Sequence, residues 1–211
     1  MHLAFDIGNV LCHVNFDDFL NELSRYKNIN TSEAYAFLGR IQKLHDVGFS
    51  LLRDELIDHF NINSNAMLDN LIDKWNNSVT INEDVILLLE NLIKTNDAKI
   101  AILSNIGLEH DVLMKKNIVE RLMKVKKENV IPFFSCDVGC RKPSYLYYHT
   151  FLSMYPQFKN CIYFDDRVEN ILAAKKFGIH SHLIDLDKSE NIKNYLYDIT
   201  DTIASQQYNK L

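Results

Sequence analysis

The feature of this sequence that most constrains its fold is the alternation of short, mostly apolar runs with amphipathic helical segments. The runs are residues 1–5, AKIAIL at 98–103, VIPFF at 130–134, CIYF at 161–164 and HSHLID at 180–185. Helical segments separate the last four runs, so successive strands need crossover connections and lie parallel to one another. The runs lack a regular polar alternation, which is typical of strands buried on both faces. We therefore predict an α/β fold with helices on both faces of a parallel sheet.

Residues 16–78 interrupt this alternation after the first predicted strand. Apolar residues recur there at steps of three and four, the spacing of amphipathic helices, and we predict no strand among them. One of these helices is expected to begin at Asn30–Glu33, where a cap residue precedes an acid in the first turn. The 211 residues are thus predicted to form one core domain, 1–15 and 79–211, with an all-helical subdomain, 16–78, inserted into it.

Charge and composition argue against several classes of function. The formal net charge is −5, whereas nucleic-acid binding needs a basic surface. No apolar stretch approaches the ~18 residues of a membrane span, and no secretory signal precedes the first strand. Cys12, Cys136, Cys140 and Cys161 match no zinc-binding spacing. We expect a cytoplasmic protein with reduced thiols and with neither a membrane nor a nucleic-acid partner.

Polar side chains follow three of the predicted strands at the point where each strand ends. They are Asp6 after the first run, Ser104 and Asn105 after AKIAIL, and Asp165 and Asp166 after CIYF. Ligands of open parallel sheets bind beyond the carboxyl ends of the strands, so these groups are expected to converge. Lys142 lies in a loop before a predicted helix, with Pro143 expected in the first turn of that helix.

A cluster of three carboxylates needs a cation, because like charges packed together repel one another. Carboxylate and carbonyl oxygens are the ligands that Mg²⁺ prefers. Ser104 and Lys142 could then hold phosphate oxygens while Asp6 attacks phosphorus, which is a known mode of carboxylate catalysis. The alternative for Asp6 is that it only caps a turn.

Four segments resemble, in order and spacing, the motifs of the haloacid dehalogenase (HAD) superfamily of phosphohydrolases. They are FDIGNVL at 5–11, ILSN at 102–105, RKP at 141–143 and FDDRVEN at 164–170. The helical block at 16–78 resembles the helical cap that this superfamily inserts between its first two motifs. The resemblance implies a Rossmann-like core, Mg²⁺ as cofactor and a small phosphorylated metabolite as substrate.

The resemblance also implies a role for each matching residue. Asp6 would be the nucleophile and a magnesium ligand, and Gly8 would offer its backbone carbonyl to the metal. Ser104 would bind the phosphoryl group with Asn105 beside it, and Lys142 would neutralise the phosphate and the attacking carboxylate. Asp166 would complete the metal site, with Asp165 as a ligand or in the surrounding shell. Asn170 stands at the last position of the fourth motif, where an acid is common.

Gly8 is the main departure from the pattern of the superfamily. Most of its phosphatases carry at this position a second aspartate that protonates the leaving group, and a glycine, which we expect to form a tight turn, has no proton to give. General acid–base help is typically worth ~10²–10⁴-fold, so its loss would slow an enzyme rather than abolish phosphoryl transfer. The D-x-G-N-V pattern resembles a branch that includes bacterial α-D-glucose-1-phosphate phosphatases, whose anomeric leaving group needs less protonation.

Three functions remain open, and a phosphatase is favoured. The others are a binding or regulatory protein that has lost turnover, and a dehalogenase, which needs neither a leaving-group acid nor a metal. The intact pair Asp165 and Asp166 speaks against the last. A sugar phosphate is the first substrate expected and a nucleotide or flavin phosphate the second, on analogy of fold. We expect a monomer or homodimer.

The helical subdomain is expected to select the substrate and to move about a hinge near residues 14–18 and 78–82. Arg40, Gln42, Lys43 and His45 are candidates to face the substrate, but helical periodicity does not decide which of them do so.

Overall fold

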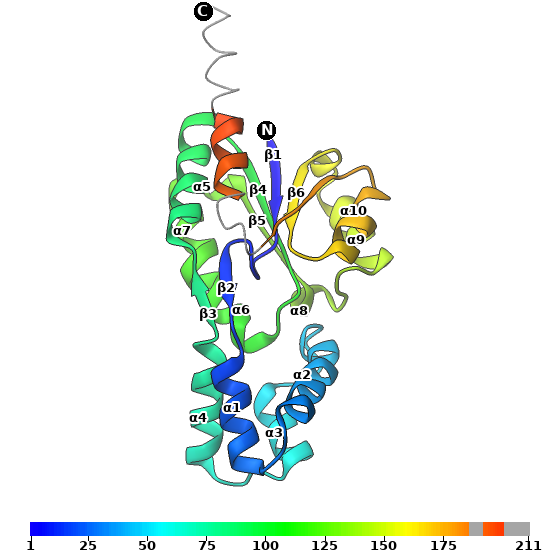
Figure 1. Cartoon of the computed structure of the whole chain (residues 1–211). Helices are drawn as coiled ribbons and strands as arrows, with labels where there is room; N and C mark the ends of the chain where they lie inside the picture. The colour runs from blue at the N-terminus through cyan, green and yellow to red at the C-terminus, as the bar shows by residue number, and fades with distance from the viewer. Residues whose placement is uncertain (186–191, 201–211) are drawn as a thin grey trace, which may run out of the picture.

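The computed structural model describes residues 1–185 and 192–200. The segment SENIKNYLYDI at 189–199 is predicted to be a helix; it lies partly outside the described range, and residues 192–200 are helical. No membrane-spanning helix is found in the described part of the chain. Figure 1 shows an elongated molecule with a sheet and its covering helices at one end and a bundle of helices at the other.

A five-stranded parallel sheet forms the centre of the larger part, in the order β5-β4-β1-β6-β7 (Figure 1). The strands are β1 (His2–Phe5), β4 (Lys99–Ser104), β5 (Val130–Phe134), β6 (Ile162–Asp165) and β7 (His180–Leu183). All five predicted runs are therefore strands, and the predicted α/β class is confirmed. Because β1 lies between β4 and β6, the ends of these three strands are neighbours at one edge of the sheet.

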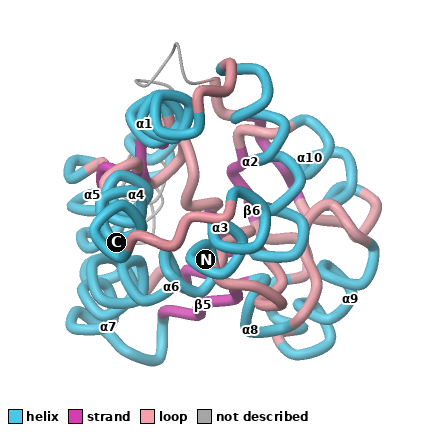
Figure 2. Tube along the Cα trace, turned by 90° about the horizontal axis from the view of Figure 1, so that it is seen from below, coloured by secondary structure: helices cyan, strands magenta, loops and turns pink. Residues whose placement is uncertain are grey.

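Helices cover both faces of this sheet, as predicted. Successive side chains of a strand point to opposite faces. Leu3 and Phe5 of β1 accordingly pack in the same apolar cluster as helices α5 and α7, whereas Ala4 packs with α9 and α10. The helices of the core are α5 (Glu83–Asn96), α6 (Leu108–Met114), α7 (Glu120–Lys126), α8 (Ser135–Val138), α9 (Tyr145–Met154) and α10 (Val168–Lys175). Seen along the long axis, α5 and α7 lie on one side and α9 and α10 on the other (Figure 2).

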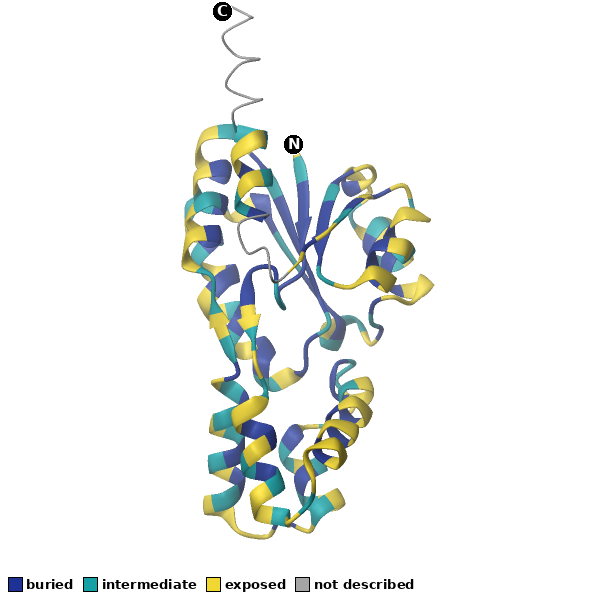
Figure 3. Ribbon diagram, viewed as in Figure 1, coloured by how far each residue is buried: buried dark blue, intermediate teal, exposed yellow. Residues whose placement is uncertain are grey.

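Residues 17–76 form four helices with an apolar core of their own. They are α1 (Asp17–Lys27), α2 (Thr31–His45), α3 (Leu52–Phe60) and α4 (Asn65–Asn76). Phe19, Leu56 and Trp75 are buried among them (Figure 3 shows the buried inner faces). The side chain of Asn30 accepts a hydrogen bond from the backbone N–H of Glu33, and the carboxylate of Glu33 accepts one from the backbone N–H of Asn30, which confirms the helix start predicted from the sequence. We call residues 17–76 the helical unit.

A short antiparallel ribbon, which the sequence analysis did not predict, connects the helical unit to the sheet. Strand β2 (Cys12–Val14) pairs with β3 (Val79–Ile81), so the chain leaves and returns side by side. Of the predicted hinge segments, 78–82 contains the whole of β3, and 14–18 begins at the last residue of β2. The division into a core and an inserted cap stays a prediction.

Two local expectations need correction. The charged segment between the second and third strand runs is predicted to be one long helix to about Lys127, but one π-helical turn (Lys115–Val119) divides it into α6 and α7. Pro143 does not lie in the first turn of α9. That helix begins at Tyr145, and its cap is Ser144, whose hydroxyl accepts a hydrogen bond from the backbone of Tyr147.

His45, at the end of α2, docks the helical unit onto the core. Its ring is buried, and its Nε2 lies 2.6 Å from Oε2 of Glu109 in α6. The other carboxylate oxygen of Glu109 accepts a hydrogen bond of 2.6 Å from the backbone N–H of Leu52. The ring of His45 fills the space beside Gly107, where a Cβ would lie 1.9 Å from its Cε1. Only glycine fits at position 107 while the ring keeps this place.

We expect Gly107→Ala to lower the free energy of unfolding by about 1–3 kcal/mol, the usual cost of overpacking, because the His45 ring must move. Gly39→Ala is the matched control. Gly39 is exposed in α2 with open space around it, so alanine there should raise stability by about 0.5–1 kcal/mol. Urea unfolding of both variants measures the difference. Equal stability of Gly107→Ala and the parent protein would contradict the docking described here.

Candidate active site

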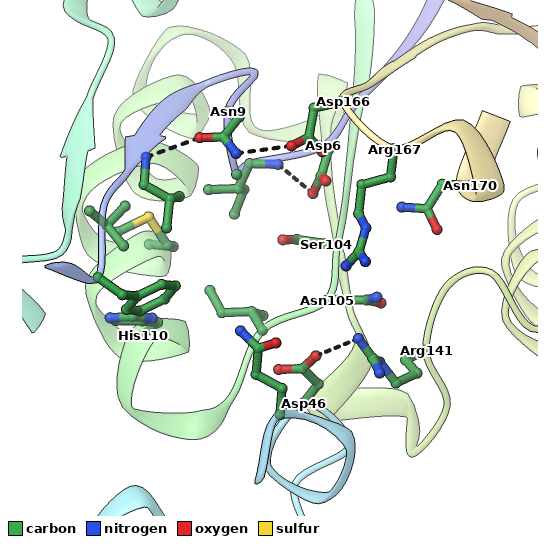
Figure 4. Close-up of a pocket in the computed structure, with 18 residues that line it drawn as sticks. Asp6, Asn9, Asp46, Ser104, Asn105, His110, Arg141, Asp166, Arg167 and Asn170 are labelled. Atoms are coloured by element: carbon green, nitrogen blue, oxygen red, sulfur yellow. Dashed lines mark hydrogen bonds and ion pairs between the residues drawn. The ribbon is translucent and has the colours of Figure 1, made fainter. Parts of the chain in front are cut away.

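A cavity of about 220 Å³ lies where the carboxyl ends of β1, β4 and β6 meet the helical unit. Of the side chains predicted to converge, four line it: Asp6, Ser104, Asn105 and Asp166, and Gly8 adds its backbone (Figure 4). The other two, Lys142 and Asp165, are buried and in direct contact with the lining residues. The predicted convergence of these residues is therefore present in the structure.

The ammonium group of Lys142 joins the strand ends. Only 1% of this residue is exposed, and its Nζ lies 2.9 Å from Oδ1 of Asp6 and 2.8 Å from Oδ2 of Asp165. It also donates to the backbone carbonyl of Leu103 at 2.7 Å and contacts the hydroxyl of Tyr163 at 3.1 Å. Burial alone would lower the pKa of Lys142, but the two carboxylates outweigh it and raise the pKa. The lysine is therefore held charged in the interior.

Asp165 is the residue that orients Lys142. Besides the ammonium group, its carboxylate accepts hydrogen bonds from the hydroxyl of Tyr163, the backbone N–H of Arg167 and the amide of Asn170. Burial would raise the pKa of Asp165, but Lys142 and these donors lower it. Because a carboxylate has about four lone-pair sites, these donors occupy Asp165. Of the two places predicted for Asp165, this favours a place in the shell around the metal ligands over direct ligation of the metal.

Asp6 has the electrostatics of a group that needs a second cation. It is 7% exposed, and one of its oxygens accepts a hydrogen bond of 2.7 Å from the backbone N–H of Ile7. Burial raises its pKa to about 7; Lys142 opposes this rise, whereas Asp165 and Asp166 add to it. The single ammonium group therefore does not compensate fully for burial and the neighbouring carboxylates.

The donor set fits a hard divalent cation. Asp6, Asp165 and Asp166 each place one carboxylate oxygen so that the three lie within 4.8 Å of one another. Asp166 is also held in place, because its Oδ2 accepts a hydrogen bond of 2.9 Å from the side chain of Asn9. Such oxygen clusters suit Mg²⁺. With Asp165 occupied by its donors, Asp6 and Asp166 are the carboxylates free to bind it.

The tight turn expected at Gly8 is present, because the backbone N–H groups of Val10 and Leu11 donate to the carbonyl of Ile7 at 3.3 and 2.9 Å, with Gly8 inside the turn. Asn9 adopts the left-handed conformation with φ 56°, whereas Gly8 does not. The side chain of Asn9 also accepts a hydrogen bond of 3.1 Å from the backbone of Val14, which fixes the loop. A Cβ at position 8 would make only an ordinary contact of 3.6 Å with Val14. The backbone therefore does not require glycine there.

Asn105 positions the lysine loop. Its amide donates to the carbonyl of Lys142 at 2.9 Å, and its carbonyl accepts from the backbone N–H of the same residue at 2.8 Å. The sequence analysis placed Asn105 beside the phosphate, and this clamp on Lys142 is a role that it did not foresee. Ser104 is buried at the end of β4 and lines the cavity. Contact of either side chain with a phosphate stays a prediction.

The helical unit contributes one wall of the cavity. Of the four candidates from α2, Gln42 lines it, whereas Arg40 pairs at the surface with His59 and the ring of His45 is bound to Glu109. Asp46, which the sequence analysis did not single out, lines the cavity next to Gln42.

The sequence analysis missed four site residues, Asn9, Asp46, His110 and Tyr163, because their places in the site depend on tertiary contacts. Asn9 lies within the first motif, and Tyr163 directly precedes the fourth. For Asn9, the available signal was a polar residue directly after Gly8. Asp46 follows a predicted helix and carries no local signal. His110 also lines the cavity; burial lowers its pKa to about 4, and its Nε2 bonds the carbonyl of Trp75 at 2.9 Å.

No model of a protein family matches this sequence, and no curated protein matches it. Solved structures do. An HAD family enzyme from Bacteroides thetaiotaomicron has a TM-score of 0.73 at 19% identity, over 89% of this chain and 94% of that one. The same enzyme has been solved with magnesium and inorganic phosphate, and that structure has a TM-score of 0.70 at 16% identity over 89% of this chain and 95% of the other.

A predicted HAD-like family hydrolase from Porphyromonas gingivalis has a TM-score of 0.72 at 17% identity, over 96% of this chain and 97% of that one. The L-2-haloacid dehalogenase of Xanthobacter autotrophicus is less similar, with a TM-score of 0.56 at 15% identity over 87% and 76%. At these identities the similarity establishes the fold, which is that of HAD family enzymes.

We expect Lys142→Met to lower the free energy of unfolding by about 3–5 kcal/mol, because Asp6 and Asp165 would remain buried without a counter-charge. Lys126→Met is the control, since the ion pair of Lys126 with Asp97 lies at the surface and its loss should change stability little. Urea unfolding measures both variants. Equal small losses would show that Lys142 does not carry the charge balance of the site.

Proposed function

We propose that this chain is a magnesium-dependent phosphatase of the HAD type, acting on a small phosphorylated metabolite through an aspartyl-phosphate on Asp6. The observation that carries the proposal is the ammonium group of Lys142 between Asp6 and Asp165 at the strand ends. A nucleophilic carboxylate needs a fixed orientation and a charged neighbour for the incoming phosphate, and Lys142 supplies both. The magnesium and phosphate bound by the Bacteroides enzyme of the same fold support this reading.

Magnesium would be held by Asp6, Asp166 and the backbone carbonyl of Gly8, with Asp165 holding Lys142. When bound, the ion neutralises the carboxylates and polarises the phosphoryl oxygens. The free oxygen of Asp6 attacks phosphorus while Lys142 and the Ser104 hydroxyl stabilise the charge that develops on the phosphoryl group. The bond between phosphorus and the leaving-group oxygen breaks, and this oxygen departs with the electron pair and takes a proton from water, since Gly8 has none to give. Water then hydrolyses the aspartyl-phosphate and releases phosphate. The helical unit, as a cap, would exclude bulk water from these steps.

We favour a sugar phosphate as substrate, with a monomeric or homodimeric enzyme in the cytoplasm. A cavity of about 220 Å³ is smaller than the pockets of ~300–1,000 Å³ that hold drug-sized ligands, so it supports a small substrate. The carboxylate cluster disfavours a dehalogenase, which needs no cation. A binding protein without turnover would leave the same geometry and is separated from an enzyme only by assay.

We expect Asp6→Asn to reduce phosphate release from p-nitrophenyl phosphate and sugar phosphates by about 10⁴-fold or more, the size of effect typical when a nucleophile is removed. Asp137→Asn, a change at the surface outside the cavity, is the control and should keep the parent rate. Phosphate release with Mg²⁺ present measures both. Normal turnover by Asp6→Asn would contradict the covalent mechanism.

Removal of divalent cations with EDTA should abolish phosphate release, and added Mg²⁺ should restore it, because the carboxylates need the ion. The same titration can be followed by thermal unfolding. Binding to the folded state alone should raise the melting temperature of the parent protein, and Asp166→Asn should weaken this rise. Activity that persists in EDTA would refute the metal requirement.

A further inference from the structure

An ion pair between the helical unit and the core lines the end of the cavity away from Asp6. Asp46 follows the last residue of α2, and Arg141 directly precedes Lys142. Nη2 of Arg141 lies 2.9 Å from Oδ2 of Asp46, and both residues line the cavity (Figure 4). A phosphoryl group bound between Asp6 and Ser104 would have this pair across the cavity from it, within the space that is open to a leaving group.

The ion pair keeps unused hydrogen-bonding capacity. Nε of Arg141 is buried and has no hydrogen-bond partner among the described residues. A guanidinium group carries five N–H donors and a carboxylate about four acceptor sites, and the single contact between the two groups uses few of them. Because a buried polar atom without a partner is costly, a ligand that offers both donors and acceptors here would be favoured.

The charge balance at this end of the cavity favours an uncharged group. Asp46 and Arg141 neutralise each other, and Arg167, the other arginine in the wall, pairs with Glu169 at 2.8 Å. A second anionic group would be repelled by Asp46, and a cationic group by Arg141. A hydroxyl group is both donor and acceptor, so it can satisfy either member of the pair.

The position of the pair is fixed by its neighbours. His45, directly before Asp46, is held by Glu109 at 2.6 Å and packs beside Gly107. The backbone N–H of Asp46 donates to the carbonyl of Gln42 at 2.9 Å, which continues the turn of α2. Arg141 directly precedes Lys142, whose backbone N–H and carbonyl are both hydrogen-bonded to the side chain of Asn105. A fixed polar pair is suited to discriminate between ligands.

We propose that Asp46 and Arg141 form the leaving-group subsite of this site and select substrates whose leaving group carries uncharged hydroxyls. This inference rests on the proposed phosphatase function and adds two specificity-determining residues to it. Gln42, on the same wall, supplies a further amide to such a group.

The test compares substrates that differ only in hydroxyls. Glycerol 3-phosphate and propyl phosphate share a three-carbon chain, and sorbitol 6-phosphate and hexyl phosphate share a six-carbon chain. The measured quantity is the ratio of kcat/KM between the members of each pair, with p-nitrophenyl phosphate as a reference without hydroxyls. We expect the parent protein to prefer the hydroxylated member of at least one pair by tenfold or more.

Two variants separate recognition from docking of the helical unit. Asp46→Asn removes the charge, and Arg141→Lys keeps an ion pair but loses the planar set of donors. Both should reduce the preference at least fivefold, mainly through KM for the hydroxylated substrate. Asp54→Asn, a change of an exposed acid in α3 of the same helical unit, is the matched control and should leave the preference unaltered.

Several outcomes would overturn the inference. The first is a kcat/KM ratio near one for every pair in the parent protein. The second is an equal proportional loss of activity on all substrates in the variants, which is expected if the ion pair only docks the helical unit. A fall in kcat for both members of each pair, with p-nitrophenyl phosphate spared, would assign Asp46 to proton donation instead. Release from p-nitrophenyl phosphate without any preference refutes the subsite alone, whereas no release from any substrate refutes the proposed function and the subsite with it.

Discussion

The buried ammonium group of Lys142 is the interaction on which the rest of the site depends. A charge in the interior is tolerated only when it is paired and fully hydrogen-bonded, and Asp6 and Asp165 pair with it from two different strands. The strand order places β1 between β4 and β6, so these groups reach one point. Asn105, directly after β4, fixes the loop that carries the lysine. The order of the strands in the sheet thus determines where the charged side chains meet.

This balance is incomplete without a further cation. Three carboxylates face one ammonium group, and burial holds the pKa of Asp6 near 7, far above its ordinary range. A divalent ion would favour the ionised form of Asp6, which is the form that can attack phosphorus. The same arrangement keeps Asp165 out of the reaction, because its oxygens already hold Lys142 and Asn170. The adjacent residues Asp165 and Asp166 therefore differ in role, since Asp165 holds Lys142 and Asp166 is free to bind the cation.

The sheet and the convergence of its strand ends could be predicted from the sequence, because buried runs and helical periodicity are local signals. The β2–β3 ribbon could not, since strands of three residues carry almost no pattern. The partners of Asp165 and the contact of Asp46 with Arg141 depend on packing between segments distant in the chain. For the same reason, Gln42 was one of four candidates in the expected cap, and helical periodicity did not decide which of them lines the cavity.

The central claim is that Asp6 is a carboxylate poised to carry a phosphoryl group beside a cation. Beryllofluoride binds such a carboxylate as a mimic of aspartyl-phosphate, and ¹⁹F NMR detects the bound form without any need for turnover or substrate. We predict bound fluorine resonances that need Mg²⁺ and that vanish in Asp6→Asn. Absence of a bound signal in the parent protein with saturating Mg²⁺, or its survival in Asp6→Asn, would contradict the account.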